Sequence, residues 1–291
     1  MEKGAGNIKH TVIALGKFDG VHRGHTALLE KTAQIARAQG LTSVVYTFPV
    51  KTGALMGGAE KQALFSDLGM DRVYAEEFTE QFRRMSAGEF VKNVLMEQFH
   101  ARHVVVGFNY RFGYQRSGDA QLLAKLCAPY GVGVTVVEPV MADGEPISST
   151  RVRALIEQGD VDAAQTLLGR RYAVTGEVLH GKQLGRTIGF PTVNLIPSQE
   201  ILLPRRGVYA TITMVDGKQV KGVTNVGPNP TVEVDAPDKV ETHLFDFDGD
   251  LYGARIKVEF VEKLRDEHTF SSVDELRKQI EEDKKRARLL L

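Results

Sequence analysis

The segment 11–39 constrains the fold most, because an apolar run, a glycine-rich turn and an amphipathic pattern follow one another there. Residues 11–15 predict a short buried strand, and residues 26–39 carry apolar side chains at helical spacing. His22 and His25 are therefore expected near a helix N-terminus. Backbone N–H groups and the helix dipole favour an anion at that end, and two imidazoles add donors. The segment predicts a phosphate-binding turn.

Glycines in this turn permit a tight backbone. Gly16, Gly20 and Gly24 remove side-chain clashes, and Phe18 and Asp19 between them are candidate contacts of the phosphate. Two other interpretations of the histidines stay open, namely ordinary loop or helix-cap residues and ligands of a metal ion. For a metal ion, no neighbouring cysteine or carboxylate cluster completes a usual ligand set.

Length and composition limit the classes of protein to consider. A chain of 291 residues with 42% hydrophobic content can bury two ordinary cores, which predicts two domains. The 37 basic and 37 acidic residues balance, so neither a nucleic-acid partner nor a membrane-surface partner is expected. The single cysteine, Cys127, is expected to be a small core residue and fits a reducing compartment. With no signal peptide or membrane-spanning run evident, we expect a cytoplasmic protein.

The first part of the chain alternates between two periodicities. Nearly continuous valine-rich runs are separated by helical patterns, which predicts a parallel sheet covered by helices on both faces, with ligands at the carboxyl ends of its strands. The glycine-rich residues 52–60 are expected to form a loop. Besides the strand and helix above, strands are expected at 43–48, 103–107 and 132–138, and helices at 86–99, 119–130 and 161–168.

The remainder of the chain reads as β-structure. Short β-rich runs separated by Gly, Pro and Asp turns predict a small closed barrel, and residues 271–290 predict a terminal helix with a solvated charged face. The helical pattern stops at Gly169, so the predicted domains are 1–169, Rossmann-like α/β, and 170–291, all-β with a terminal helix. The expected strands are 172–180, 207–215, 219–226, 241–247 and 255–261.

A second candidate phosphate element opens the helical pattern after residue 147. Its sequence, Ile-Ser-Ser-Thr-Arg-Val-Arg, supplies three hydroxyls and two arginines. Ser149 or Thr150 could simply cap the helix. The other interpretation is a phosphate clamp, in which Arg153 offers its planar set of donors to pyrophosphate.

A glycine-rich approach to a strand lies in the second domain, which has no Walker-type phosphate loop. Thr192 and Asn194 are two residues apart and therefore point to one face of a strand. Their oxygens are hard ligands suited to Mg²⁺ carrying a nucleotide, and the glycines Gly181 and Gly185 permit close backbone approach. Ordinary strand polarity is the competing interpretation.

These strings together resemble a known family. Residues 16–25 read Gly-x-Phe-Asp-Gly-x-His-x-Gly-His, and residues 185–194 read Gly-Arg-x-x-Gly-Phe-Pro-Thr-Val-Asn. With the elements at 147–153, 105–119 and 225–253, they are similar to the bacterial bifunctional riboflavin kinase/FMN adenylyltransferases, the prokaryotic FAD synthetases. The resemblance covers nearly the whole chain. It implies riboflavin, FMN and ATP as substrates and Mg²⁺ as cofactor, and leaves the oligomeric state open.

For the first domain, the resemblance implies attack of an FMN phosphate oxygen on the α-phosphorus of ATP. His22 and His25 would stabilise the transition state, and Ser149, Thr150 and Arg153 would hold ATP phosphates. Flavin contacts are implied for two further residues, Asn109 and Phe112. Alternation of residues 108–112 places at least one or two of their aromatic rings in the core.

Two positions depart from the family pattern. Asn109 stands where the family commonly has Asp, which keeps an acceptor and removes a charge. After Phe48 the family continues Pro-His-Pro, whereas this chain reads Pro-Val-Lys-Thr-Gly. The missing histidine motivates an alternative, a riboflavin kinase whose adenylyltransferase is weakened or lost.

For the second domain, the resemblance implies a riboflavin kinase. Gly181, Gly185 and Arg186 would bind ATP, and Glu241 would be the general base for the ribityl 5′-hydroxyl. An ion pair with a lysine or arginine is the competing role of Glu241. His243 is expected on the same strand face, where it could orient Glu241 or be structural. A non-catalytic flavin-binding regulator remains the alternative of a different class.

Overall fold

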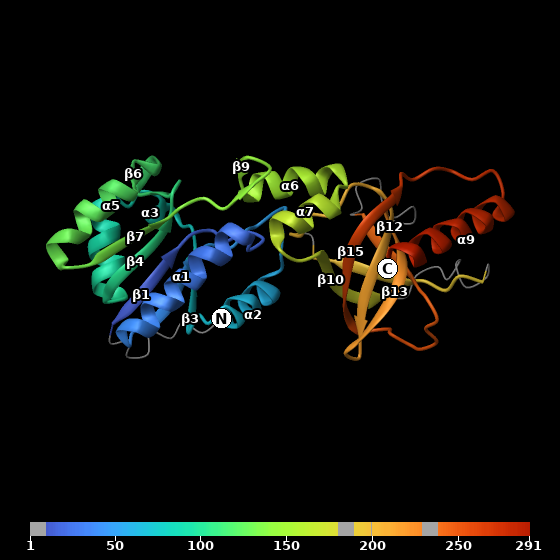
Figure 1. Ribbon diagram of the computed structural model, residues 1–291, viewed down its shortest axis with the longest axis horizontal. Helices are drawn as coiled ribbons and strands as arrows, with labels where there is room; N and C mark the ends of the chain where they lie inside the picture. Colours follow the sequence, from blue (N-terminus) through green and yellow to red (C-terminus); the bar gives the residue numbers. More distant parts are fainter. Residues whose placement is uncertain (1–9, 180–188, 199, 229–237) are drawn as a thin grey trace. The chain divides into compact units, whose positions relative to one another are not determined.

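The computed structural model describes residues 10–179, 189–198, 200–228 and 238–291 (Figure 1). The described chain divides into two compact units. The first contains the described residues up to Val50 together with Gly58–Ile147, and the second contains Lys51–Gly57 and the described residues from Ser148 onward. Each unit has its own sheet and its own core.

The first unit is built on a five-stranded parallel sheet in the order β3-β2-β1-β4-β7. This confirms the predicted α/β class. The strands are β1 Thr11–Leu15, β2 Thr42–Thr47, β3 Arg72–Ala75, β4 Ala101–Gly107 and β7 Gly133–Val137, and the helices are α1 Arg23–Gln39, α2 Gly58–Asp67, α3 Glu80–Arg83, α4 Ala87–Glu89, the π-helix Phe90–Gln98 and α5 Ala120–Cys127.

Helices cover both faces of this sheet. One face buries Ile13, Leu15 and Tyr46 against the π-helix and α5, in a core that also holds Cys127. Helix α1 packs against β1, β2 and β4, in front of the sheet in Figure 1. Burial on both faces explains the near-continuous apolar runs of the central strands.

Several elements of the first unit were not predicted from the sequence, among them α2 and β3. Helix α2 begins at Gly58, inside the segment 52–60 that was expected to be a loop, and buries only Phe65. Strand β3 is an edge strand whose four residues are partly or fully exposed. Neither element carries a periodic apolar pattern, because neither buries a full face.

Short elements complete the first unit. They are the hairpins β5 Arg111–Phe112 with β6 Gly118–Asp119 and β8 Met141–Ala142 with β9 Glu145–Pro146, and the 3₁₀ turns Tyr114–Arg116 and Ala128–Tyr130.

The second unit contains a closed barrel, β10-β11-β14-β13-β12-β15, with antiparallel pairing throughout. The predicted barrel is thereby confirmed. Its strands are β10 Tyr172–Leu179, β11 Val193–Pro197, β12 Gly207–Val215, β13 Lys218–Gly227, β14 Lys239–Leu244 and β15 Arg255–Arg265, and the helices of this unit are α6 Ser149–Gln158, α7 Val161–Leu168 and α9 Val273–Leu290.

Alternation along the strands separates the barrel interior from its outer face. Thr211, Thr224 and Thr242 are fully buried and form a hydroxyl ladder with O···O distances of 2.8 and 2.9 Å. Because side chains alternate along β14, Glu241 and His243 lie on the outer face.

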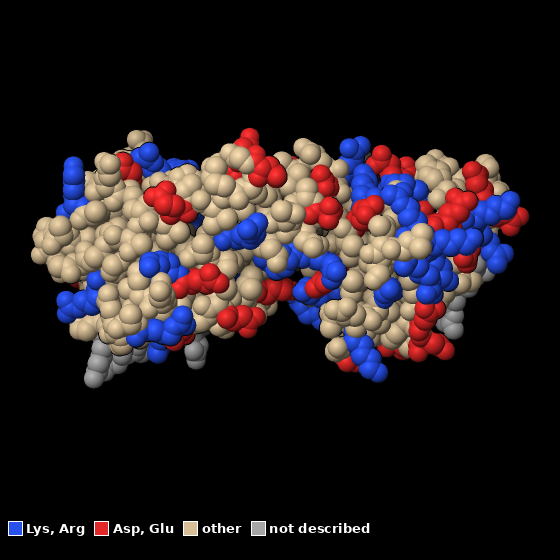
Figure 2. All heavy atoms as spheres, viewed as in Figure 1, with Lys and Arg blue, Asp and Glu red and all other residues tan. Residues whose placement is uncertain are grey.

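Helix α9 is anchored by one buried ion pair. The Arg265 guanidinium donates two hydrogen bonds to Asp283 Oδ2, at 2.8 and 3.1 Å, and Asp283 is buried. The other charged side chains of α9 are mostly exposed, and Figure 2 shows both signs interleaved over this helix. The prediction of a solvated face holds except at Asp283. In the described part of the chain, the helices are all too short or too polar to span a membrane.

Candidate active sites

The glycine-rich turn lies at the topological switch point of the parallel sheet. The chain runs from β1 outward to β2 and β3, then returns to β4 on the other side of β1. The loops that leave β1 and β4 therefore diverge, and ligands of open α/β sheets bind in the crevice so formed. The turn carries His22, and the loop after β4 carries Asn109.

The two predicted histidines are in direct contact. His22 is the N-cap of α1, and its Nδ1 accepts the backbone N–H of His25 at 3.3 Å. A neutral His22 ring therefore carries its proton on Nε2, which makes that atom a donor. The rings stack, with centroids 3.6 Å apart and planes inclined by 17°. The predicted position at a helix N-terminus is confirmed.

The turn itself is conformationally demanding. Gly20 has φ +73°, and the buried residues Phe18 and Val21 also have positive φ values, 50° and 38°. For a β-branched residue such as Val21 this is an unusual conformation, of the kind that concentrates at functional sites. Cβ atoms at Gly16 and Gly24 would lie 3.0 Å from Phe18 and 3.2 Å from His22. A side chain at either position would crowd the neighbouring ring, which agrees with the expected use of glycine there.

Lys61 is a neighbour of this turn that the sequence did not reveal. Its Nζ donates to the carbonyl oxygen of Lys17 at 2.6 Å and to Thr47 Oγ1 at 3.1 Å. Burial lowers the pKa of Lys61 to about 8, against a raising influence of Asp19. A lone lysine directly after the predicted loop 52–60 gives no sequence signal.

Of the element at residues 147–153, Ile147 ends the first compact unit and residues 148–153 belong to the second. Ser148 caps α6 by accepting the backbone N–H of Arg151 at 3.3 Å. The interpretation that Ser149 or Thr150 caps this helix is therefore wrong. Ser149 and Thr150 begin the first turn of the helix. The Arg153 guanidinium donates to the carbonyl oxygen of Gly53.

The aromatic residues after β4 divide between core and surface. Phe112 is buried, stacks on Tyr110 with centroids 5.7 Å apart and packs on Phe90. Phe108 and Asn109 are exposed. The expectation that one or two of these rings are core residues is confirmed, and Phe112, a predicted flavin contact, is one of them.

On the barrel, Thr192, Asn194 and Glu241 come together. Thr192 Oγ1 donates to Glu241 Oε1 at 2.9 Å, and Asn194 is the register partner of Glu241 across β11 and β14. The alternative ionic role of Glu241 is also present, because Lys239 Nζ lies 3.1 Å from Glu241 Oε2. Asn225, the register partner on the opposite side, extends this polar row across three strands.

His243 lies beside this row. A ring nitrogen, Nδ1, is 2.9 Å from the carbonyl oxygen of Pro191, the residue before Thr192. The ring contacts Phe190 and Phe245 edge-on, at centroid distances of 5.5 and 5.7 Å. Burial lowers the pKa of His243. This contact joins His243 to the backbone that carries Thr192, and its expected role, orienting or structural, stays a prediction.

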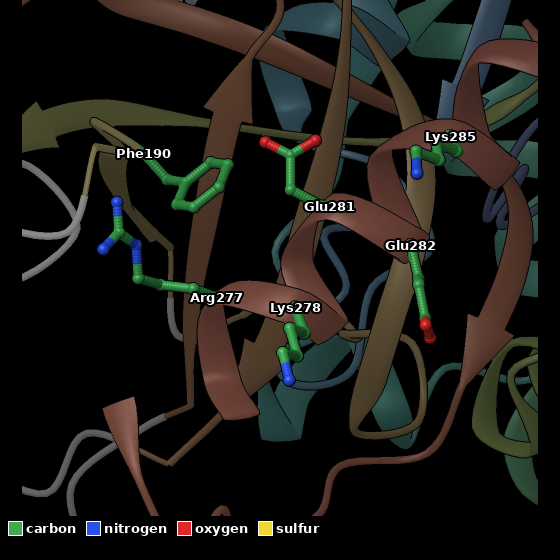
Figure 3. Close-up of a pocket in the computed structure, with 6 residues that line it drawn as sticks. All are labelled: Phe190, Arg277, Lys278, Glu281, Glu282 and Lys285. Carbon is green, nitrogen blue, oxygen red and sulfur yellow. The ribbon is translucent and has the colours of Figure 1, made fainter. Parts of the chain in front are cut away.

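A surface hollow of about 370 Å³ opens beside Phe190. Figure 3 shows Arg277 and Glu281 projecting from α9 on the side of the Phe190 ring. The charges of α9 were expected to form a solvated face, and no sequence pattern connects them with Phe190. Gly181, Gly185 and Arg186, and residues 229–231 of the turn at 225–231, lie outside the described residues.

Comparisons with known proteins also divide the chain into two parts. Residues 5–151 match the model of the FAD synthetase family, and residues 168–291 match that of the riboflavin kinase family. The fold and the matches define a two-domain enzyme of flavin-cofactor synthesis. The chain belongs to the bifunctional riboflavin kinase/FMN adenylyltransferase family, as the motifs predicted.

Individual relatives extend over almost the full length. The chain is 38% identical to the bifunctional riboflavin kinase/FMN adenylyltransferase of Pseudomonas fluorescens, over 96% of this chain and 92% of that protein. It is also 38% identical to the Escherichia coli K12 enzyme, over 95% and 91%. A crystal structure described as a macrolide-efflux protein from Streptococcus pneumoniae superposes with a TM-score of 0.89, at 32% identity and 97% and 95% coverage.

Proposed function

We propose that the barrel phosphorylates riboflavin to FMN and that the parallel-sheet domain then adenylates FMN to FAD, each step consuming ATP. Family membership over nearly the whole chain supports both activities. The observation that carries the assignment is the hydrogen bond between Thr192 and Glu241, which places a carboxylate beside candidate metal ligands. We propose domain limits of 1–169 and 170–291.

In the kinase step, the riboflavin 5′-hydroxyl oxygen attacks the γ-phosphorus of ATP. The bond to the bridging oxygen of ADP breaks, and Glu241 accepts the hydroxyl proton. The Thr192 hydroxyl donates a hydrogen bond to Glu241, so its oxygen lone pairs would be available to a cation, together with the Asn194 amide oxygen. These hard oxygens fit Mg²⁺, which neutralises phosphate charge when bound. Gly181, Gly185 and Arg186, which lie outside the described residues, remain the proposed ATP contacts.

In the adenylyl step, an FMN phosphate oxygen attacks the α-phosphorus of ATP and pyrophosphate leaves, without a protein nucleophile. His22 offers Nε2–H, and His25 holds that ring by stacking. Positioned donors of this kind stabilise the charge of the transition state. The backbone of the turn, Gly16 to Gly24, cradles a phosphate.

Four further residues belong to the proposed adenylyl site. Ser149, Thr150 and Arg153 bind ATP phosphates, and Asn109, exposed after β4, contacts the flavin nucleotide. Phe112 supports this region from the core.

One time course tests the proposal. Purified protein is incubated with riboflavin, ATP and Mg²⁺, and the three flavins are separated chromatographically. FMN that rises and then converts to FAD is the expected result. FMN without FAD, also when FMN is supplied directly, selects the kinase with a lost adenylyltransferase. Flavin binding without ATP consumption selects the regulator.

A further inference from the structure

Lys61 holds an ammonium group where two parallel strands end. Its two hydrogen-bond acceptors are the carbonyl of Lys17, just after β1, and the hydroxyl of Thr47, the last residue of β2. An ammonium has three N–H donors. Among the described residues, two acceptors bind this ammonium, so one of its N–H donors is left for a further group.

The surroundings of this ammonium compensate its charge only in part. Both hydrogen-bond acceptors are neutral, and Asp19 is the anion that acts on it within the described chain. Burial outweighs Asp19 and lowers the pKa of Lys61 to about 8. An additional anion at this position would offset the cost of desolvating the ammonium.

A chain of ring contacts connects Lys61 with the histidine pair. Its Nζ lies 5.7 Å from the Phe65 ring centroid, and Phe65 packs edge-on against Phe18 at 5.8 Å. Phe18 in turn packs edge-on against His25 at 5.2 Å. Lys61 therefore reaches the glycine-rich turn from α2, and the histidines reach it from α1.

We propose that Lys61 binds a phosphate oxygen of the nucleotide held at the turn of His22 and His25. The inference rests on the proposed adenylyltransferase and names a further substrate-binding residue of that site. The ligand class is a phosphate monoester or a polyphosphate, supplied by FMN or by ATP respectively. A purely structural link from α2 to β1 and β2 is the competing role.

Substitution in the full chain separates these roles. Lys61→Met removes the charge and keeps most of the side-chain length, Lys61→Arg keeps the charge, and Lys92→Met is the control at an exposed lysine of the same unit. FAD formation from FMN and ATP is measured, with KM determined for each substrate. Because hydrogen bonds to charged groups are strong, Lys61→Met raises one of the two KM values about 10- to 100-fold.

The substrate affected identifies the source of the phosphate. A rise confined to the KM of FMN assigns Lys61 to the monoester, and a rise confined to the KM of ATP assigns it to the polyphosphate. Lys92→Met stays within about twofold of wild type. If both KM values of Lys61→Met also stay within that range, the proposal is wrong.

A pH profile covers the case in which Lys61→Met does not fold. Between pH 7 and pH 9 the wild-type ammonium loses its proton, so the same KM rises, whereas Lys61→Arg stays charged and shows a smaller rise. Lys17, Asp19, Arg23 and the two histidines of the turn, together with Glu60 beside Lys61, are also titratable, and they are common to both proteins. Identical profiles would contradict the proposal.

The reference variant His25→Ala separates this inference from the proposed function. If wild type forms no FAD from FMN, the adenylyltransferase itself fails. If His25→Ala abolishes FAD formation and Lys61→Met does not alter it, the adenylyltransferase stands and Lys61 is only structural.

Discussion

The His22 and His25 rings stack with their centroids 3.6 Å apart, and the backbone N–H of His25 is bound to the His22 ring. Each ring therefore defines the position of the other. Removing either ring disturbs the donor set at the glycine-rich turn, and removing His22 also disturbs the start of α1.

This coupling predicts non-additive effects of substitution. His25→Ala lowers FAD formation from FMN by about 10²- to 10³-fold, as expected for loss of a positioned donor, and leaves FMN formation from riboflavin intact. His22→Ala has a similar effect and also removes the helix cap. Because the rings act as a unit, the double variant loses less than the product of the two single losses. Multiplicative losses in steady-state kinetics would show that they act independently.

Glu241→Ala abolishes FMN formation and spares FAD formation from supplied FMN, because the proposed base belongs to the barrel alone. Glu177→Gln, at an exposed position of β10, keeps both activities within about twofold and serves as the control. The two half-reactions are followed separately by chromatography. Equal loss of both activities in Glu241→Ala would rule out the assignment to two sites.

Thr192→Val tests the proposed metal ligand. The variant keeps the shape of the side chain and removes the oxygen that bonds to Glu241. The Mg²⁺ concentration for half-maximal kinase activity rises about 10- to 100-fold, the range typical of groups that support a metal site. Thr192→Ser restores the oxygen and a near-normal Mg²⁺ requirement. An unchanged requirement in Thr192→Val would exclude it as a ligand.

Asp283→Ala detaches α9 from the barrel. The substitution leaves Arg265 without its buried partner, and breaking such pairs costs about 3 to 5 kcal/mol. Asp246→Ala, which removes the exposed carboxylate paired with Arg288, costs about 0 to 1 kcal/mol. Hydrogen exchange of α9 amides in the full chain measures both. Equal protection in the two variants would show that Asp283 does not anchor α9.

Local signals predicted the elements with a full buried face. Strand β12, Gly207–Val215, and helix α7, Val161–Leu168, have the predicted limits because each combines strong periodicity with clear breakers. The β14 prediction was displaced, since the strand runs from Lys239 to Leu244 and ends before Phe247. The polar residues at the two ends of β14 carry no periodic signal that marks its limits.

The candidate sites divide in the same way. The motif residues His22 and His25 could be found from the sequence because they are three residues apart, at the start of one helix. Lys61 could not, because its partners Lys17 and Thr47 are 44 and 14 residues away in the chain. Nor could the contact of His243 with Pro191, 52 residues away.

The sequence by itself determined the two-domain plan, the α/β and barrel classes and the family, because these depend on periodicity and on short motifs. Only the tertiary structure decided that Thr192 and Glu241 share a hydrogen bond, that Lys61 reaches the glycine-rich turn and that Asp283 is buried beside Arg265. Each of these joins segments distant in the chain. Such contacts depend on strand order and register, which local residue patterns do not encode.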